Sequence, residues 1–288
     1  MIARRWIVAA DGTLRAPWRF LVFLGAVAVC VPVATSVVVP ALARMYSLLG
    51  IGVSAAGWGW MVGLLGAHFV ALRLVDRRPW SDVWLDGSAA RVGLLARGLA
   101  IGALAIGIPI LLLVGLGWLQ RLARPDGSWM GAALRASVFL LPAAFFEELT
   151  TRGYVFALLR QSLGAGWALA ATSVAFGLLH LQNAGASVQS VSIVVLAGFF
   201  LGGVLLATRS LYAAWMAHFA WNWTMAVLFH TAVSGLVLES PDYRYVDAGP
   251  DWATGGDWGP EGGAAGGLGM IGGLTYLYAR QRRRREDS

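Results

Sequence analysis

The sequence predicts an all-α fold, a polytopic bundle of about eight transmembrane helices. Of its 288 residues, 58% are hydrophobic and only 13% are charged, whereas a soluble domain carries about 25% charged residues. The mean hydropathy is +0.67. Several runs of roughly 18 or more apolar residues are long enough to cross a bilayer as helices. These three observations together indicate one helical membrane domain.

Apolar runs place the expected spans at residues 20–41, 50–72, 99–119, 132–163, 167–181, 188–207, 211–229 and 264–278. The first run follows arginines, as in a signal peptide, and Ala41-Leu42-Ala43 is similar to a cleavage site. It is longer than the 7–15 residues of a signal-peptide core, so we expect an uncleaved first span. Cys30, the single cysteine, lies in this run. An internal disulfide and a cysteine-based metal site are therefore excluded.

The segments between the spans carry their own signals. After the second span, Trp80, Val83, Trp84 and Leu85 predict a short amphipathic piece at the membrane interface. Pro125-Asp126-Gly127 predicts a turn after the third span. Residues 235–263 are acidic and rich in glycine, and we expect no packed element there. The last span is also glycine-rich and leads into an arginine-rich tail.

All 22 basic residues are arginines, and the net charge is +7. With the N-terminus inside, the expected outer segments hold only five of them: Arg44, Arg121, Arg124, Arg135 and Arg244. This asymmetry follows the positive-inside rule and predicts a multi-pass protein of the cell membrane with both termini in the cytoplasm. No basic stripe is interleaved with aromatic residues, so we expect membrane lipid as a partner and no nucleic acid.

The fourth span contains the most unusual stretch of the chain, Glu147 and Glu148 followed by Arg152. Ionised carboxylates are costly in a membrane, so a glutamate pair there indicates a functional site. Glu148 and Arg152 are four residues apart and can pair on one helix face. Glu147 is then left for another partner and could serve as a general base for water. A structural ion pair at a helix end is an equally good interpretation of this stretch alone.

Two later spans carry candidate partners for Glu147. Phe176 precedes His180 by four residues on an apolar helix, and His218 precedes Asn222 by four. Either histidine alone is more often a hydrogen-bonded packing residue than a catalytic one. His218 with Asn222 could also join helices, hold an anion or donate to an oxyanion. His68 and His230 have no comparable neighbours and are interpreted as structural or interfacial.

Together, the three stretches resemble the CPBP intramembrane metalloprotease family, which includes the type II CAAX prenyl proteases and the Abi bacteriocin-immunity proteins. Its pattern is E-E-x-x-x-R, then F-x-x-x-H, then H-x-x-x-N or H-x-x-x-D, and all three motifs match without departure. The resemblance covers roughly residues 132–229. It does not extend to the first three spans or the acidic loop.

This resemblance implies an intramembrane endopeptidase that cuts a membrane-associated protein or peptide. By carry-over, Glu147 and His180 activate a water, His218 and Asn222 stabilise the oxyanion, and Glu148, Arg152 and Phe176 support the site. Glu147, His180 and His218 could also hold zinc, and the sequence does not decide between water alone and a metal. H-E-x-x-H is absent, so nothing indicates the ordinary zincin site. Nothing in the sequence indicates prenylated substrates.

Two alternatives stay open. One is a non-catalytic membrane protein of the same fold, acting in bacteriocin self-immunity or as a scaffold. The other is a proton-coupled transporter, although the sequence shows no inverted repeat.

We divide the chain into N-terminal helices with the amphipathic connection (1–131), a catalytic core (132–231), and the acidic loop with the last span and basic tail (232–288). The expected span limits place Glu147 midway to the inner end of the fourth span and His180 towards the outer end of the fifth span. For the two residues to meet, we expect the fifth span to begin later than residue 167 or the fourth span to tilt.

Overall fold

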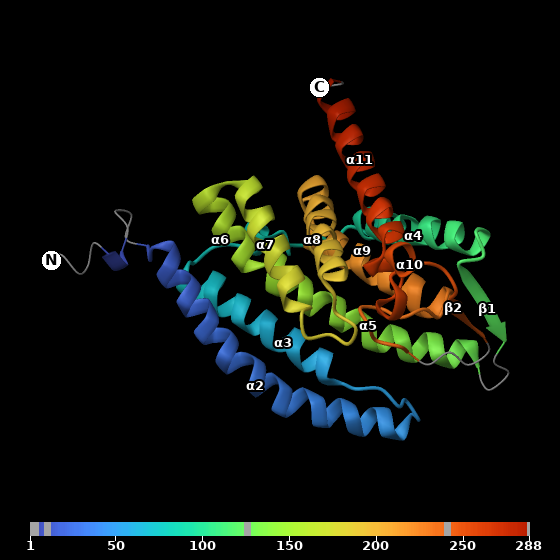
Figure 1. Ribbon diagram of the computed structural model, residues 1–288. Helices are drawn as coiled ribbons and strands as arrows, with labels where there is room; N and C mark the ends of the chain where they lie inside the picture. Colours follow the sequence, from blue (N-terminus) through green and yellow to red (C-terminus); the bar gives the residue numbers. More distant parts are fainter. Residues whose placement is uncertain (1–5, 9–12, 124–127, 239–242, 287–288) are drawn as a thin grey trace.

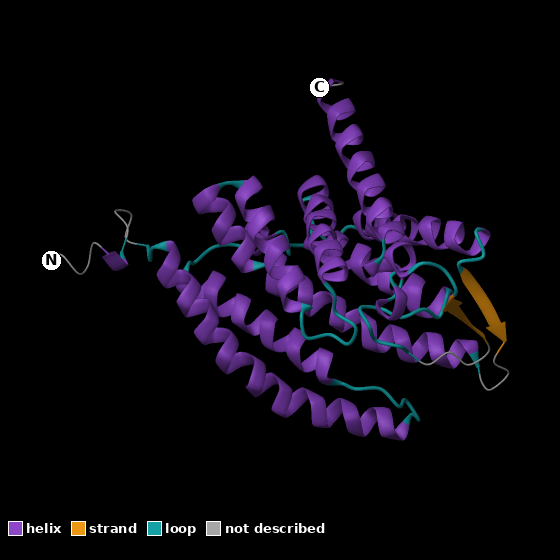
Figure 2. Ribbon diagram, in the orientation of Figure 1, coloured by secondary structure: helices purple, strands orange, loops and turns teal. Residues whose placement is uncertain are grey.

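The computed structural model describes residues 6–8, 13–123, 128–238 and 243–286, and it confirms the all-α polytopic fold (Figures 1 and 2). The turn predicted at residues 125–127 lies outside the described residues. Most of the chain is helical, and the described strands, β1 (Leu119–Ala123) and β2 (Tyr243–Asp247), form one antiparallel pair. These strands join the end of the third expected span to the acidic loop.

The first two expected spans form a pair of long helices along one flank of the molecule (Figure 1). They are α2 (Ala16–Leu48) and α3 (Ala56–Phe69). A Cβ at Gly63 would lie 2.5 Å from the Val31 Cα, so only glycine allows this approach. The chain continues from α3 as a π-helical segment, η1 (Val70–Val75).

The connection after η1 contributes to the protein core, and its predicted place at the membrane interface stays a prediction. It forms a 3-10 turn, η2 (Trp80–Val83), and both Val83 and Leu85 are buried. The Tyr212 hydroxyl donates to the Leu85 carbonyl at 3.1 Å. Val83 and Leu85 therefore pack against the neighbouring helices.

The remaining helices follow the predicted order with shifted limits. They are α4 (Val92–Gly115), α5 (Trp129–Arg152), α6 (Tyr154–Leu163), α7 (Ala165–Leu179), α8 (Val188–Thr208), α9 (Leu211–Trp223) with its π-helical continuation η3 (Thr224–Leu228), and α11 (Ala264–Glu286). Because α7 begins at Ala165, the expectation of a later start for the fifth span is wrong.

A break at Gly153 divides the predicted fourth span into α5 and α6. His68 explains the break, because its Nε2 lies 2.9 Å from the backbone nitrogen of Tyr154 and accepts that N–H. Its Nδ1 donates to the Leu64 carbonyl at 2.7 Å. A Cβ at residue 153 would lie 2.1 Å from the imidazole Nε2. The structural role predicted for His68 is thus the capping of α6.

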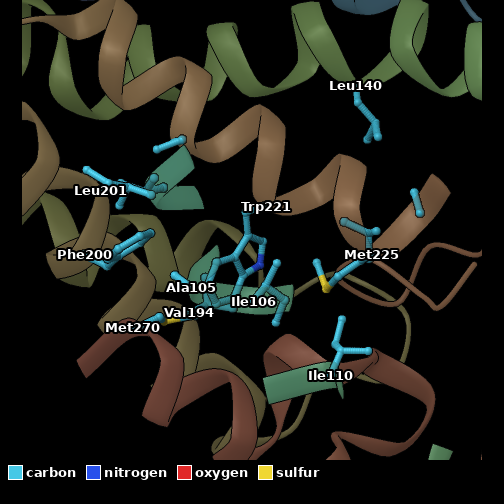
Figure 3. Close-up of a cluster of buried hydrophobic side chains, with 14 of the residues drawn as sticks. Ala105, Ile106, Ile110, Leu140, Val194, Phe200, Leu201, Trp221, Met225 and Met270 are labelled. Atoms are coloured by element: carbon cyan, nitrogen blue, oxygen red, sulfur yellow. The ribbon is translucent and has the colours of Figure 1, made fainter. Parts of the chain in front are cut away.

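The main hydrophobic core lies where α4, α8, α9 and α11 meet (Figure 3). Ile106 and Ile110 of α4 are completely buried, and they belong to the same cluster as Phe200 and Trp221. A second cluster joins α2, α3, α6 and the start of α9. The candidate site is built on α5, α7 and α9, between these two cores.

Five helical stretches are long and apolar enough to cross a membrane: Ala16–Leu48, Ala56–Val75, Val92–Gly115, Trp129–Leu163 and Val188–Thr208. Among the other expected spans, α7 is a shorter apolar helix of 15 residues. The seventh continues from α9 through η3 over residues 211–228. The protein is therefore a multi-pass membrane protein, and the count of eight spans stays a prediction.

The acidic segment is packed, which is the largest departure from the expected fold. Besides β2 it contains α10 (Asp251–Thr254) and two 3-10 turns, η4 (Gly256–Trp258) and η5 (Pro260–Gly262). Trp258 is among the largest fully buried side chains, and Glu261 is buried as well. Gly259 has φ +97°, a conformation that favours glycine and lets the chain turn back onto residue 232.

Candidate active site

The last turns of α5 carry a buried ion pair. Nη1 of Arg152 lies 3.0 Å from Oε1 of Glu148, and neither side chain is exposed. Arg152 also donates to the Gly198 carbonyl of α8 at 3.1 Å and lies over the Phe176 ring, 4.3 Å from its centroid. The pairing predicted from the four-residue spacing is therefore present. The guanidinium compensates a carboxylate that has no access to water.

Glu148 has a second partner, which the sequence did not predict. Nδ1 of His218 lies 2.9 Å from the same Oε1 that pairs with Arg152. A carboxylate neutralised by arginine is an acceptor only, so the hydrogen bond is donated by Nδ1–H of the histidine. Glu148 therefore fixes the ring of His218 and links α5 to α9.

His180 is fixed in the same way from its own helix. It lies directly after α7, and its Nδ1 is 2.8 Å from the carbonyl oxygen of Phe176. A carbonyl can only accept, so Nδ1 of His180 also carries a proton. The Phe176 ring lies 4.8 Å from the ring of His180 and 5.9 Å from that of His218. Phe176 thus packs against both imidazoles.

Glu147 is the point on which both imidazoles converge. Its Oε2 lies 3.8 Å from Nε2 of His180 and 3.8 Å from Nε2 of His218. These separations are too long for hydrogen bonds, and this buried oxygen has no partner among the described residues. An imidazole that is neutral and protonated at Nδ1 presents a lone pair at Nε2. Three acceptors therefore face one small space, an arrangement that suits a water or a cation.

Asn222 lies one turn beyond His218 on α9 and lines an enclosed cavity with His218 and His180. The cavity volume is about 20 Å³, enough for about one water molecule. Glu147 of α5 does not line this cavity; its Oε2 faces Nε2 of His180 and Nε2 of His218, so the two histidines lie between Glu147 and the cavity that Asn222 lines. The predicted chemical roles of these four residues are not tested by this arrangement.

The cavity has one acidic lining residue that sequence reasoning missed, Glu261 of η5. Its Oε2 accepts from Nε1 of Trp221 at 2.8 Å, and its Oε1 accepts from the backbone nitrogen and the hydroxyl of Ser234, both at 2.6 Å. These donors satisfy a buried carboxylate. Its loop is 39 residues beyond Asn222 in the chain and carries no recognisable spacing, so no local signal could have identified it.

The donor set at Glu147 fits zinc in kind. Carboxylate oxygen and imidazole nitrogen are ordinary zinc ligands, and ligands at roughly 2.0–2.1 Å in a tetrahedron are about 3.4 Å apart. The observed 3.8 Å separations are slightly wider. Within the described ranges, no three His, Cys, Asp or Glu residues are spaced as a ready-made metal centre. A small inward movement of Glu147, His180 and His218 would be needed to hold the ion.

Comparison with known families agrees with this geometry. Residues 128–224 match the family model described as type II CAAX prenyl endopeptidase Rce1-like. The matched segment contains Glu147, Glu148, Arg152 and both histidine motifs, and it ends before Glu261. No curated protein and no solved structure matches the chain.

Proposed function

The chain belongs to the CPBP family through residues 128–224, and from this premise we propose that it is an endopeptidase that hydrolyses a peptide bond of a membrane-associated protein or peptide. The observation that carries the proposal is the convergence of both Nε2 atoms on Oε2 of Glu147. A carboxylate with unsatisfied acceptor capacity beside two oriented imidazoles is suited to orienting and deprotonating a water.

In the proposed reaction, a water donates one hydrogen bond to Glu147 and the other to Nε2 of His180. Its oxygen attacks the scissile carbonyl carbon while its proton moves to Glu147. The carbonyl oxygen becomes an oxyanion that accepts from the Asn222 amide. Glu147 then delivers the proton to the leaving nitrogen as the carbon–nitrogen bond breaks, which leaves a carboxylic acid and an amine.

His218 has two assignments in this scheme. When both of its ring nitrogens are protonated, Nε2 can donate to the oxyanion beside Asn222, while Nδ1 donates to Glu148. Were zinc bound, Glu147, His180 and His218 would hold it, and the ion would activate water as a Lewis acid. Arg152 pairs with Glu148 in both cases, so the support of the site does not depend on the choice.

The fold supports this chemistry at membrane depth. Polar groups within the bilayer must be buried in protein or line a cavity, and the cavity beside His180 and His218 is enclosed by apolar residues of α8, α9 and α11. Such surroundings limit bulk water at the reacting groups and strengthen their electrostatic interactions.

The direct test is cleavage in proteoliposomes. The full chain and its Glu147→Ala variant are each reconstituted with a set of membrane peptides, and new peptide termini are identified by mass spectrometry. We expect cleavage products from the wild type alone, with both proteins inserted to the same extent. Equal products from the two proteins would refute the proposal. Metal content measured on the same preparations distinguishes zinc from water alone.

A further inference from the structure

A second feature, remote from the glutamate pair, is an apolar groove between α4 and α11. Its volume is about 440 Å³, within the range of about 300–1,000 Å³ of pockets that hold small ligands. It extends along α4 from Arg97 to Leu112, a rise of about 22 Å at 1.5 Å per residue. This exceeds the hydrocarbon depth of one leaflet, about 15 Å. The groove is therefore long enough for an extended acyl chain.

The groove lies beside a point at which α11 and α4 approach closely. A Cβ at Gly269 would lie 1.8 Å from the Ala105 carbonyl oxygen, so the two backbones touch there. Near Gly272, by contrast, a Cβ would meet nothing within 4 Å. Leu104 and Ile108 of α4 line the groove and remain exposed. The space is open to whatever surrounds the helices, which in a membrane is lipid.

One end of the groove is strongly basic. Arg97 lines the groove and also a small adjoining cavity of about 20 Å³, which Arg280 of α11 lines from the other side. Thr208 and Gln281 complete its polar lining. The apolar part of α4 begins directly after Arg97, and the arginine-rich end of α11 follows Arg280. This end thus has the character of a membrane–water boundary.

We propose that the groove between α4 and α11 binds one anionic phospholipid, with an acyl chain along Leu104 and Ile108 and the phosphate at Arg97 and Arg280. Basic pockets between transmembrane helices recognise anionic headgroups by charge-assisted hydrogen bonds. A zwitterionic lipid would bring a further cation, its choline group, beside the two guanidinium groups. The headgroup charge therefore determines the preference, and the acyl chain determines the location.

The test uses the full chain in detergent with phosphatidylglycerol or phosphatidylcholine added, and native mass spectrometry to count bound lipids. We expect one tight phosphatidylglycerol and no comparable phosphatidylcholine. Arg97→Gln with Arg280→Gln should weaken this binding by roughly tenfold or more, since one ordinary charge-assisted contact is worth about that factor. The matched control, Arg91→Gln with Arg283→Gln, removes two exposed arginines outside the groove and should bind as the wild type does.

A second pair of variants tests the acyl-chain part. Gly272→Leu places a side chain in the open groove, whereas Gly93→Leu adds the same group to α4 outside it, where a Cβ also meets nothing. Gly272→Leu should lose the bound lipid, and Gly93→Leu should keep it. A phosphatidylglycerol with a photoreactive chain should label α4 and α11 in the wild type. Equal binding of the two lipids, equal loss in the two arginine pairs, or labelling confined to other helices would each overturn the proposal.

Discussion

Glu148 holds His218: Oε1 of the glutamate lies 2.9 Å from Nδ1 of the imidazole while it pairs with Arg152 at 3.0 Å. The second glutamate of the motif therefore does more than form an ion pair within α5. It orients the imidazole that faces Glu147, in the way that a carboxylate orients a metal-bound or catalytic histidine. Stability and activity should depend on this residue through different partners.

Removal of the arginine tests the ion pair. Arg152→Ala leaves the buried Glu148 carboxylate uncompensated, and breaking a buried pair costs about 3–5 kcal/mol. We expect loss of both stability, measured by thermal unfolding in detergent, and activity. Glu148→Gln with Arg152→Gln removes both charges and should regain part of the stability.

The same double variant separates the two roles of Glu148. Because an amide oxygen is a weaker acceptor for Nδ1–H of His218 than a carboxylate, we expect activity to stay low although stability returns in part. A double variant no more stable than Arg152→Ala would contradict the pairing. A double variant with wild-type activity would contradict the role assigned to Glu148 in orienting His218.

Glu147→Gln tests the general base. The amide keeps the shape of the side chain but cannot take a proton from water, so proteolysis should be nearly abolished while the protein still folds and inserts. His180→Ala should have the same effect. Because catalytic groups act as a unit, the two changes together should be scarcely worse than either alone.

The outcome for Glu147→Gln also separates the enzyme from its alternatives. An immunity scaffold would keep its cellular effect in this variant, and a proton relay would lose transport with no peptide bond cut in the wild type. Full peptidase activity in Glu147→Gln, measured as the release of new peptide termini, would end the proposed mechanism.

Asn222→Ala tests oxyanion stabilisation separately. Loss of one such donor typically lowers the rate by about 10²–10³, so a measurable residue of activity should remain. Asn183→Ala is a suitable control, because that amide donates to the Ser234 carbonyl near the cavity without lining it. Cleavage rates at saturating substrate should fall only in the first variant. Equal rates in Asn222→Ala and the wild type would remove this residue from the mechanism.

The arginine asymmetry predicts that both termini face the cytoplasm, and labelling in intact cells can check it. In a Cys30→Ser background, single cysteines are introduced at Ser288 and Asp257. Gly255 is unsuitable, because a side chain there would collide with the Gly259 carbonyl, whereas Asp257 is exposed. We expect an impermeant thiol reagent to label position 257 and not 288, and the opposite pattern would reverse the topology.

What the sequence predicted well is local. Glu148 and Arg152 pair because helical spacing places them on one face. Apolar runs predict helices because both burial in a core and insertion into a membrane require apolar side chains. The break at Gly153 depends on His68, which is 85 residues away in the chain. Pairing of β1 with β2 joins segments 120 residues apart or more. Such contacts arise from tertiary packing, and the pattern of apolar residues within one segment does not indicate which distant segment it will contact.

Glu261 is the sharpest example of such a contact, and its role in the site gives the last prediction. The carboxylate joins Trp221, next to Asn222 on α9, to Ser234 in the following loop. Glu261→Gln keeps the shape but replaces one acceptor oxygen by a donor, so one buried donor loses its partner at a cost of about 1–3 kcal/mol. Because the carboxylate also lines the cavity, the cleavage rate should fall together with the thermal stability.

A double-mutant cycle identifies the contact responsible. Trp221→Phe removes the indole N–H, so its combination with Glu261→Gln should cost less than the sum of the single changes, with a coupling of about 0.5–3 kcal/mol as for residues in contact. Asp257→Asn, an exposed change in the same segment, should leave both stability and cleavage unaltered. If the losses of unfolding free energy in the two single variants add up to the loss in the double variant within about 0.5 kcal/mol, Glu261 does not hold Trp221. Wild-type cleavage by Glu261→Gln would show that the cavity functions without this carboxylate.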